Sequence, residues 1–91
     1  MSDKETVQKM INELYETIIR LKTTDDCKLL FEDLCTHKEV ENMAQRICAA
    51  RLLKKGETYN QVMQKTGIAS ATLARVSSCV KYGKGYDKFV K

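Results

Sequence analysis

The sequence predicts an all-α protein that contains a helix-turn-helix. The chain of 91 residues has no proline, and its four glycines all lie at or after Gly56, so the first 55 residues contain no strong helix breaker. Apolar residues recur at helical spacing along that stretch. The segment 58–81 then combines a short amphipathic stretch, a glycine and a second amphipathic stretch, which is typical of a helix-turn-helix.

The predicted helix-turn-helix has a first helix from about Tyr59 to Lys65, a turn at Gly67 and a second helix from Ser70 to Val80. Gly67 can adopt a positive φ without steric cost, as the end of a helix often requires. Either Ser70 or Thr72 is expected to cap the second helix. The apolar residues that the two helices would bury together are Val62, Ile68, Leu73 and Val76.

Small or hydrogen-bonding residues are expected to face outward from the second helix. They are Ser70, Ala71, Thr72, Ala74 and Arg75. Such side chains suit a close approach to base edges in a major groove. Met63 departs mildly from the motif, because a smaller residue is common at that position. An ordinary helical hairpin, in which the glycine only turns the chain, is the alternative interpretation.

Four further helices are predicted outside this motif. They are Thr6–Lys22, a helix capped by Thr24, a helix capped by Thr36 that ends at Lys54 or Lys55, and Tyr86–Val90. The connections between them are too short to separate domains. We therefore expect one domain over residues 1–91, with dimerisation helices in 1–55, the helix-turn-helix in 58–81 and a C-terminal helix in 84–91.

The first predicted helix carries a wider apolar stripe than one side of a small core requires. The stripe consists of Val7, Met10, Ile11, Leu14, Ile18 and Leu21, widened by Tyr15 and Ile19. A second apolar surface, such as a subunit interface, would explain this width. A partner chain would also help the stability of a chain this short, which can bury only a modest core.

The net charge of +4 conceals a strong asymmetry along the chain. Residues 1–43 contain six Lys or Arg and ten Asp or Glu, whereas residues 44–91 contain ten Lys or Arg and only two carboxylates, Glu57 and Asp87. The basic half coincides with the helix-turn-helix, as phosphate binding requires. A basic face that only keeps the protein soluble is the competing explanation for the charge.

The residues needed for catalysis or for a metal site are sparse. Cys27, Cys35, Cys48 and Cys79 are far apart in the sequence, and His37 is the only histidine. We expect no metal site and buried, reduced cysteines that behave as small apolar residues. No glycine-rich phosphate loop is present, so we expect no enzyme. The absence of a long apolar stretch and of a signal-peptide pattern leads us to expect a cytoplasmic protein without a membrane span.

The segment from Asn42 to Tyr86 resembles the Trp repressor superfamily, most closely its YerC/YecD-like branch. The resemblance rests on A-Q-R-I in the long helix, on L-L-K-K-G-E, and on T-G-I-A-S-A-T-L-A-R-V in the motif. It implies a six-helix Trp-repressor-like fold and an interlocked homodimer. In such a dimer the two helix-turn-helix units enter successive major grooves of double-stranded DNA.

The resemblance also implies a ligand site. In the Trp repressor two arginines flank bound tryptophan, and the matching positions here are Arg46 and Arg75. The glycine that leaves room for the indole is replaced by Val76, and a serine near the ligand amino group by Cys79. We therefore expect no cofactor, and tryptophan in particular not to bind. Alternatively, Arg46 pairs with a carboxylate of the acidic half, while Arg75 pairs within the dimer or contacts a phosphate.

These features lead us to expect a sequence-specific DNA-binding regulator, most simply a repressor, that acts as a homodimer. Phosphate contacts are assigned to Lys54, Lys55, Lys65, Lys81 and Lys84, while Gln61 and Gln64 reach phosphates or bases. Base-edge contacts are assigned to Ser70, Ala71, Thr72 and Ala74. The first alternative is a regulator gated by a small anionic metabolite between the two arginines. The second is a protein-interaction module that does not bind DNA.

Overall fold

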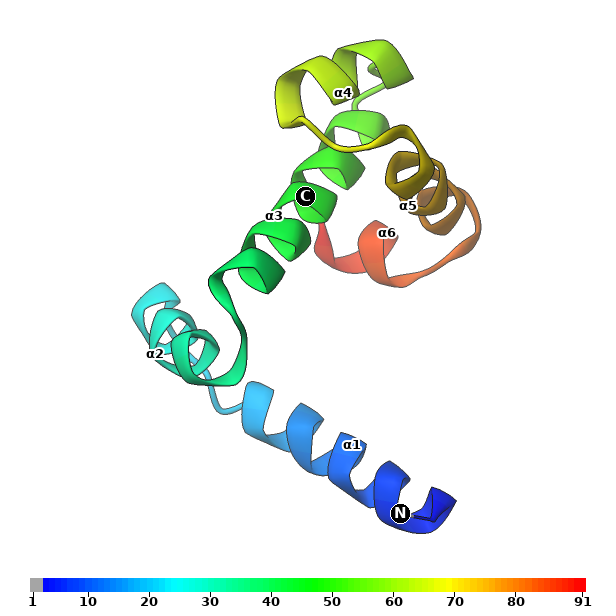
Figure 1. Cartoon of the computed structure of the whole chain (residues 1–91). Helices are drawn as coiled ribbons and strands as arrows, with labels where there is room; N and C mark the ends of the chain where they lie inside the picture. The colour runs from blue at the N-terminus through cyan, green and yellow to red at the C-terminus, as the bar shows by residue number, and fades with distance from the viewer. Residues whose placement is uncertain (1–2) are drawn as a thin grey trace. The chain divides into compact units, whose positions relative to one another are not determined.

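The computed structural model describes residues 3–91, which form six helices and no strand (Figure 1). The helices are α1 (Lys4–Ile18), α2 (Thr24–Leu34), α3 (His37–Lys54), α4 (Tyr59–Thr66), α5 (Ser70–Tyr82) and α6 (Gly85–Phe89). The predicted all-α class and the six predicted helices are confirmed. The chain divides into two compact units, Met1–Thr36 and His37–Lys91, and each is described by itself.

Both helices of the first unit begin one or more residues before the predicted position. Helix α1 is capped by Asp3, whose carboxylate accepts a hydrogen bond of 2.7 Å from the backbone N–H of Thr6. That bond holds the pKa of Asp3 below its usual value. Helix α2 is capped by Thr23, not Thr24, because the Thr23 hydroxyl accepts from the N–H of Asp26 at 3.0 Å. Helix α1 also ends at Ile18, four residues earlier than predicted.

The first unit has no buried residue among residues 3–36. The large apolar side chains that stay exposed are Val7, Met10, Leu14, Tyr15 and Ile19, together with Leu29 and Leu34 of α2. Met10, in the middle of the α1 stripe, is 50% exposed. The wide apolar stripe is therefore present as predicted and is left largely uncovered within the chain.

The second unit holds the apolar core, which lies where α4 and α5 pack against α3 (Figure 1). The core consists of Ala49, Ala50, Val62, Ile68, Leu73, Val76 and Val90. All four residues predicted for the core of the helix-turn-helix are among them. The two alanines of α3 are completely buried, and their small side chains let α4 and α5 approach the α3 backbone closely.

The helix-turn-helix has the predicted turn but different helix caps. Gly67 adopts a φ of +74° and its N–H donates to the Met63 carbonyl, which ends α4 at Thr66. The predicted cap of α5 by Ser70 or Thr72 is wrong, because Ser70 is already helical and Ala69 occupies the cap position. An alanine side chain cannot accept a hydrogen bond, so α5 begins without a side-chain cap.

The connection between α3 and α4 is only four residues long, and every backbone N–H in it is used. Lys55 and Gly56 donate back to the last turn of α3, and Glu57 donates to the Leu52 carbonyl at 3.2 Å. Gly56 has a φ of +91°, which a glycine adopts without strain. Thr58 donates to the Gln61 side chain, completing a capping box that starts α4.

The C-terminal helix α6 has five residues and is attached to α3 by polar contacts. The Lys54 ammonium donates to the carbonyls of Tyr86, Asp87 and Val90 at 3.3, 3.0 and 2.7 Å. Arg51 adds a bond of 3.0 Å to the carbonyl of Lys91. Since Val90 itself lies in the core, α6 and the residues after it form part of the second unit.

Candidate functional site

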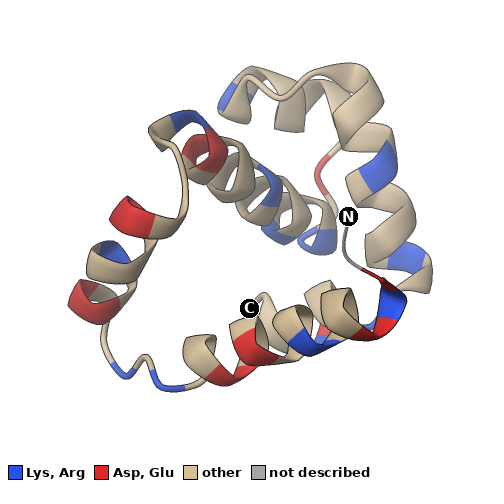
Figure 2. Ribbon diagram, turned by 60° about the horizontal axis from the view of Figure 1, so that its bottom comes forward, with Lys and Arg blue, Asp and Glu red and all other residues tan. Residues whose placement is uncertain are grey.

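The outer face of α5 presents the residues predicted to contact base edges. Ser70, Ala71, Thr72, Ala74 and Arg75 are all exposed. Their neighbours Leu73 and Val76 point into the core, so the outward orientation follows from helical geometry. Neither α4 nor α5 contains a carboxylate, whereas α1 and α2 carry both signs of charge (Figure 2). This face therefore carries short side chains and one arginine, and its two helices contribute no negative charge.

A polar hollow lies beside the uncapped start of α5. It has a volume of about 450 Å³ and is lined by Lys38, Asn42, Gln45, Arg46, Gly67, Ala69 and Thr72. The Gln45 amide donates to the Thr66 carbonyl at 2.9 Å and so fastens the turn to α3. The first-turn N–H groups of a helix have no intrahelical acceptors, and the helix dipole favours an anion there. The side chains of Arg46 and of Lys38, which also pairs with Glu41 at 3.9 Å, thus line a hollow next to the first-turn N–H groups of α5, which have no side-chain cap.

The predicted phosphate contacts fall into two groups. Lys55, Lys81 and Lys84 are exposed and form no ion pair with the described residues. The Lys54 ammonium donates hydrogen bonds to the carbonyls of the C-terminal segment, and its side chain is only 27% exposed. Lys65 forms an ion pair of 2.6 Å with Glu57. The structure thus leaves three of these five lysines without an internal partner.

The two glutamines of α4 differ in the hydrogen bonding of their side chains. The Gln61 side-chain oxygen accepts the Thr58 N–H at 2.8 Å, so Gln61 has a capping role that the sequence analysis missed. Thr58 and Gln61 are three residues apart, which is the capping-box spacing, and that pattern was the available signal. Gln64 is exposed on the same helix.

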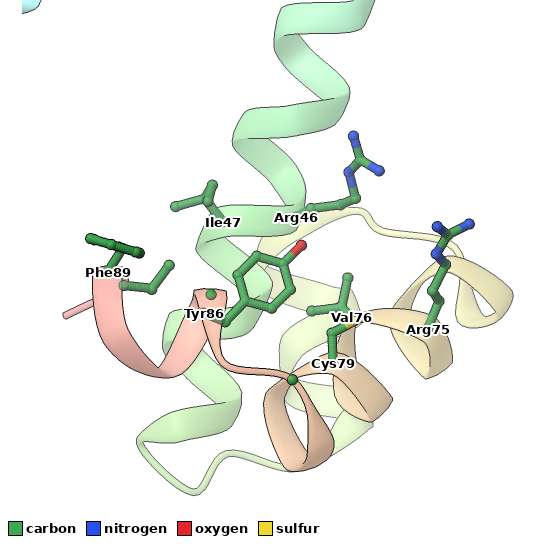
Figure 3. Close-up of a pocket in the computed structure, with 10 residues that line it drawn as sticks. Arg46, Ile47, Arg75, Val76, Cys79, Tyr86 and Phe89 are labelled. Carbon is green, nitrogen blue, oxygen red and sulfur yellow. The ribbon is translucent and has the colours of Figure 1, made fainter. Parts of the chain in front are cut away.

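The four residues assigned to a ligand site line one open pocket of about 490 Å³ (Figure 3). Its walls are formed by Arg46 and Ile47 of α3, Arg75, Val76 and Cys79 of α5, and Gly83, Gly85, Tyr86, Phe89 and Val90 around α6. Arg46 is half-buried and Arg75 is exposed, and Arg46 forms no ion pair with a carboxylate of its own unit. The pocket is therefore apolar at its walls and cationic at one side.

Tyr86 and Phe89 are pocket residues that the sequence analysis treated only as anchors of the last helix. The Tyr86 ring extends from α6 into the space between Arg46 and Val76 (Figure 3). Val76 is 2% exposed, whereas Cys79 is exposed at the pocket wall. No local sequence signal indicates that α6 folds back to this position, because the contact depends on the tertiary attachment through Lys54.

The predicted burial of the cysteines is wrong. Cys27 and Cys79 are exposed, and Cys35 and Cys48 are only partly buried. Cys27 and Cys79 are exposed because they face outward from α2 and α5. All four thiols are free, and residues 3–91 contain no cluster of three or more His, Cys, Asp or Glu that could hold a metal ion. In the same range, no helix combines the length and apolarity of a membrane span.

Comparisons with known proteins identify relatives over nearly the whole chain. The chain is 40% identical over 75 residues to the uncharacterized protein YerC of Bacillus subtilis strain 168, which covers 82% of this chain and 72% of YerC. A crystal structure of a candidate Trp repressor from Staphylococcus aureus matches with a TM-score of 0.84 and 30% identity, over 94% of this chain and 89% of that chain. A TrpR-like protein from Eubacterium eligens matches with a TM-score of 0.84 and 36% identity, over 88% and 84% of the two chains.

The match to a protein-family model supports the same assignment. Residues 9–91 match the model of the Trp repressor protein family. The resemblance predicted from the helix-turn-helix and the long helix is thereby confirmed, as is the likeness to YerC. The chain belongs to the Trp repressor family, a family of transcription regulators rather than enzymes.

Proposed function

We propose that the protein is a sequence-specific DNA-binding transcriptional repressor that acts as a homodimer in the cytoplasm. The observation that supports this most directly is the outer face of α5. Its exposed side chains are short or, in Arg75, positively charged, and the two helices of the motif contain no carboxylate. Such a face can approach the base edges of a major groove without repelling the phosphates beside it.

In the proposed complex, α5 lies in the major groove and its surroundings hold the phosphates. Thr72 reaches a base edge, and water fills the gaps left by Ala71 and Ala74. The N–H groups of the uncapped first turn of α5 donate to a phosphate oxygen, and Lys38 and Arg46 of the adjacent hollow supply positive charge. Lys55 and Lys81 contact phosphates further away.

The uncovered stripe on α1 supports the homodimer. Four large apolar residues of that helix and its C-cap Ile19 are exposed, and a soluble monomer rarely leaves so much apolar surface in water. Packing the stripe against a second copy would remove it from solvent and give the assembly two helix-turn-helix units. A dimer then predicts an operator with two related half-sites about 10 base pairs, or one helical turn, apart.

Selection of bound sequences from a random pool of DNA tests the proposal. We expect enrichment of a two-fold symmetric site, and the distance between its halves gives the dimer geometry. Enrichment of no sequence, with only weak and uniform binding, would support a protein-interaction module instead. Replacing Thr72 should then change the affinity unequally among variants of the selected site.

The neighbouring residues Lys54 and Lys55 provide a matched pair of substitutions. We expect Lys55→Ala to weaken binding to all sequences alike and to reduce the slope of log affinity against log salt by about 1, because one phosphate contact is lost. We expect Lys54→Ala to leave that slope unchanged but to lower the thermal stability, because three carbonyls lose their donor. Anisotropy titrations at several salt concentrations and thermal melts measure both. Equal salt slopes for the two variants would contradict this assignment.

A ligand-gated regulator is the second candidate, and the pocket between α3 and α5 favours it. The pocket has apolar walls, and two arginines stand at one side of it (Figure 3). This combination suits a small carboxylate with an apolar body, since guanidinium groups bind carboxylates strongly. Because both α3 and α5 line the pocket, a ligand there could alter how the recognition helix is held.

Tryptophan is not expected to be that ligand. The buried Val76 places a branched side chain at the pocket wall, and overpacking of this kind costs about 1–3 kcal/mol, or roughly one to two decades of affinity. The Cys79 thiol is also a weaker hydrogen-bonding group than a hydroxyl. Calorimetric titration should show no binding below millimolar tryptophan, and the affinity for DNA should not rise when tryptophan is added. A micromolar dissociation constant would contradict the expectation, whereas partial binding by Val76→Gly would identify the valine as the obstacle.

A further inference from the structure

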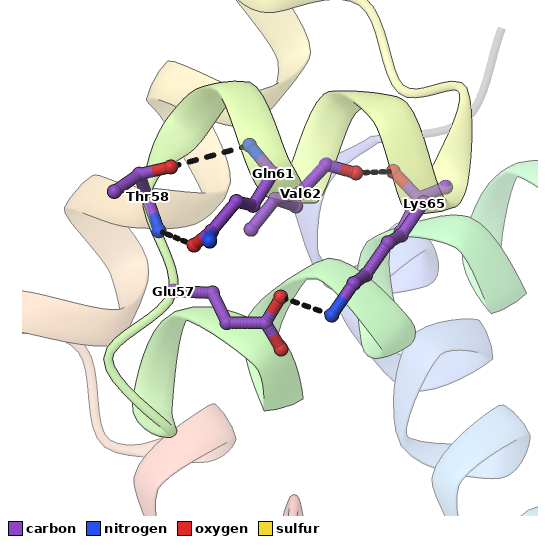
Figure 4. Close-up of polar contacts among 6 residues, drawn as sticks. Glu57, Thr58, Gln61, Val62 and Lys65 are labelled. Carbon is purple, nitrogen blue, oxygen red and sulfur yellow. Dashed lines mark hydrogen bonds and ion pairs between the residues drawn. The ribbon is translucent and has the colours of Figure 1, made fainter.

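The ion pair between Glu57 and Lys65 is the shortest side-chain contact of the helix-turn-helix (Figure 4). The carboxylate of Glu57 precedes α4, and the ammonium of Lys65 comes from its last turn, eight residues later. The two groups are 2.6 Å apart. This ion pair thus links the two ends of α4. It also engages Lys65, which could otherwise bind a DNA phosphate.

The two partners of this pair differ in their freedom to move. Glu57 follows Gly56 in the tight connection after α3, its N–H donates to the Leu52 carbonyl, and its side chain is 20% exposed. The side chain of Lys65 is 58% exposed, and the four carbons that carry its ammonium group are flexible. The carboxylate is therefore the fixed member, and the ammonium is the member that can leave the pair and turn to another anion.

The charge distribution makes this carboxylate unusual. Residues 44–91 contain two carboxylates, and the other one, Asp87, belongs to the C-terminal segment beside Lys54. Glu57 is the acidic residue that directly precedes α4 in the chain, while Glu41 of α3 lines a hollow with Lys65 and Thr66 and pairs with His37 and Lys38 instead. Glu57 is not needed as the cap of α4, because the Thr58 and Gln61 side chains already form the capping box there (Figure 4).

We propose that Glu57 competes with DNA phosphate for Lys65 and thereby lowers the affinity for every DNA sequence. This inference rests on the proposed DNA-binding function. For Lys65 to contact a phosphate, its ion pair with Glu57 must first break. The unpaired Glu57 carboxylate then attracts a cation from solution. That uptake offsets part of the counterion release that drives binding to DNA. Glu57 therefore sets the strength and salt dependence of binding without altering which sequence is preferred.

The test compares Glu57→Gln with the wild type on the selected operator and on unrelated DNA. Glutamine keeps the shape of the side chain and removes its charge. We expect affinity to rise up to about fivefold on both DNAs, the range for losing an exposed ion pair, and the salt slope to steepen by up to about 1. An unchanged affinity would overturn the proposal. Thermal melts check that the variant is folded.

Two further variants separate competition for Lys65 from a general change of charge. Asp87→Asn removes a negative charge from the same half of the chain without touching Lys65, and it should change affinity less than Glu57→Gln. In a Lys65→Ala background, Glu57→Gln should change affinity no more than Asp87→Asn does. An equal gain in that background would overturn the proposal. A wild-type protein that binds no DNA would instead overturn the proposed function itself.

Discussion

Replacing Met10 with glutamate is expected to separate the dimer into monomers at micromolar concentration. Met10 lies in the middle of the α1 stripe and is 50% exposed within the chain, so its substitution disturbs the isolated fold little. A two-fold interface contains the change twice. Losing the remaining apolar burial of both side chains costs about 1.5–3 kcal/mol, since a full burial contributes about 1.5–3 kcal/mol each and about half of it remains. Each glutamate also brings a charge into the interface, which costs more, so the dimer should weaken by about a hundredfold or more.

A matched control exists one residue earlier in α1. Lys9 is exposed and lies on the face of the helix opposite the centre of the stripe, and Lys9→Gln changes the net charge by the same amount. Sedimentation at micromolar concentration should show twice the chain mass for the wild type and for this control, and the chain mass for Met10→Glu. The DNA affinity should fall in parallel, because a monomer presents one helix-turn-helix only. A wild-type protein that sediments as a monomer would refute the dimer.

Replacing Leu73 with alanine is expected to have the largest effect on the free energy of unfolding. Leu73 is completely buried where α5 meets α3 and α4. Truncating a buried leucine removes its transfer energy and leaves a cavity, at a cost of about 2–5 kcal/mol. Because small domains are stable by only about 5–15 kcal/mol, this loss should bring the protein close to unfolding at moderate temperature.

The conservative variant Leu73→Met provides the control for this measurement. It keeps the volume of the side chain nearly constant and should cost less than about 1.5 kcal/mol. Urea denaturation followed by circular dichroism, at one fixed protein concentration, measures both variants. A loss below 1 kcal/mol for Leu73→Ala would mean that the surrounding helices collapse into the cavity and that the core does not hold α5 rigidly.

The sequence predicted the helices and the core of the second unit because these depend on local patterns. Val62 lies before Gly67, and Leu73 and Val76 follow it at a helical spacing of three residues. The structure buries all three. The same regularity predicted the outward face of α5, since residues that are not turned inward must face solvent. Helix ends were less accurate, because a cap depends on which of several adjacent polar residues reaches the N–H groups, as Thr23 does in place of Thr24.

The parts that escaped prediction are those that depend on distant contacts. Lys54 looked like any basic residue at the end of a helix, yet it binds carbonyls more than 30 residues away. Tyr86 enters the pocket only because that attachment brings α6 back to α3 and α5. Arg46 and Arg75 were assigned to one site by resemblance to a family, and the structure places both at the same pocket. Spacing along the chain alone could not have paired them.

The four-residue connection between α3 and α4 restricts how this protein can change during evolution. Each of its N–H groups already donates to a fixed acceptor, and Gly56 holds the one left-handed conformation in it. An inserted or deleted residue would break that set of bonds and shift the start of α4 relative to α3. Such a shift would disturb the core that Ala50 and Val62 share. Related chains can therefore be expected to vary the exposed side chains of α5 far more freely than the length of the connection that positions α4 and α5 against α3.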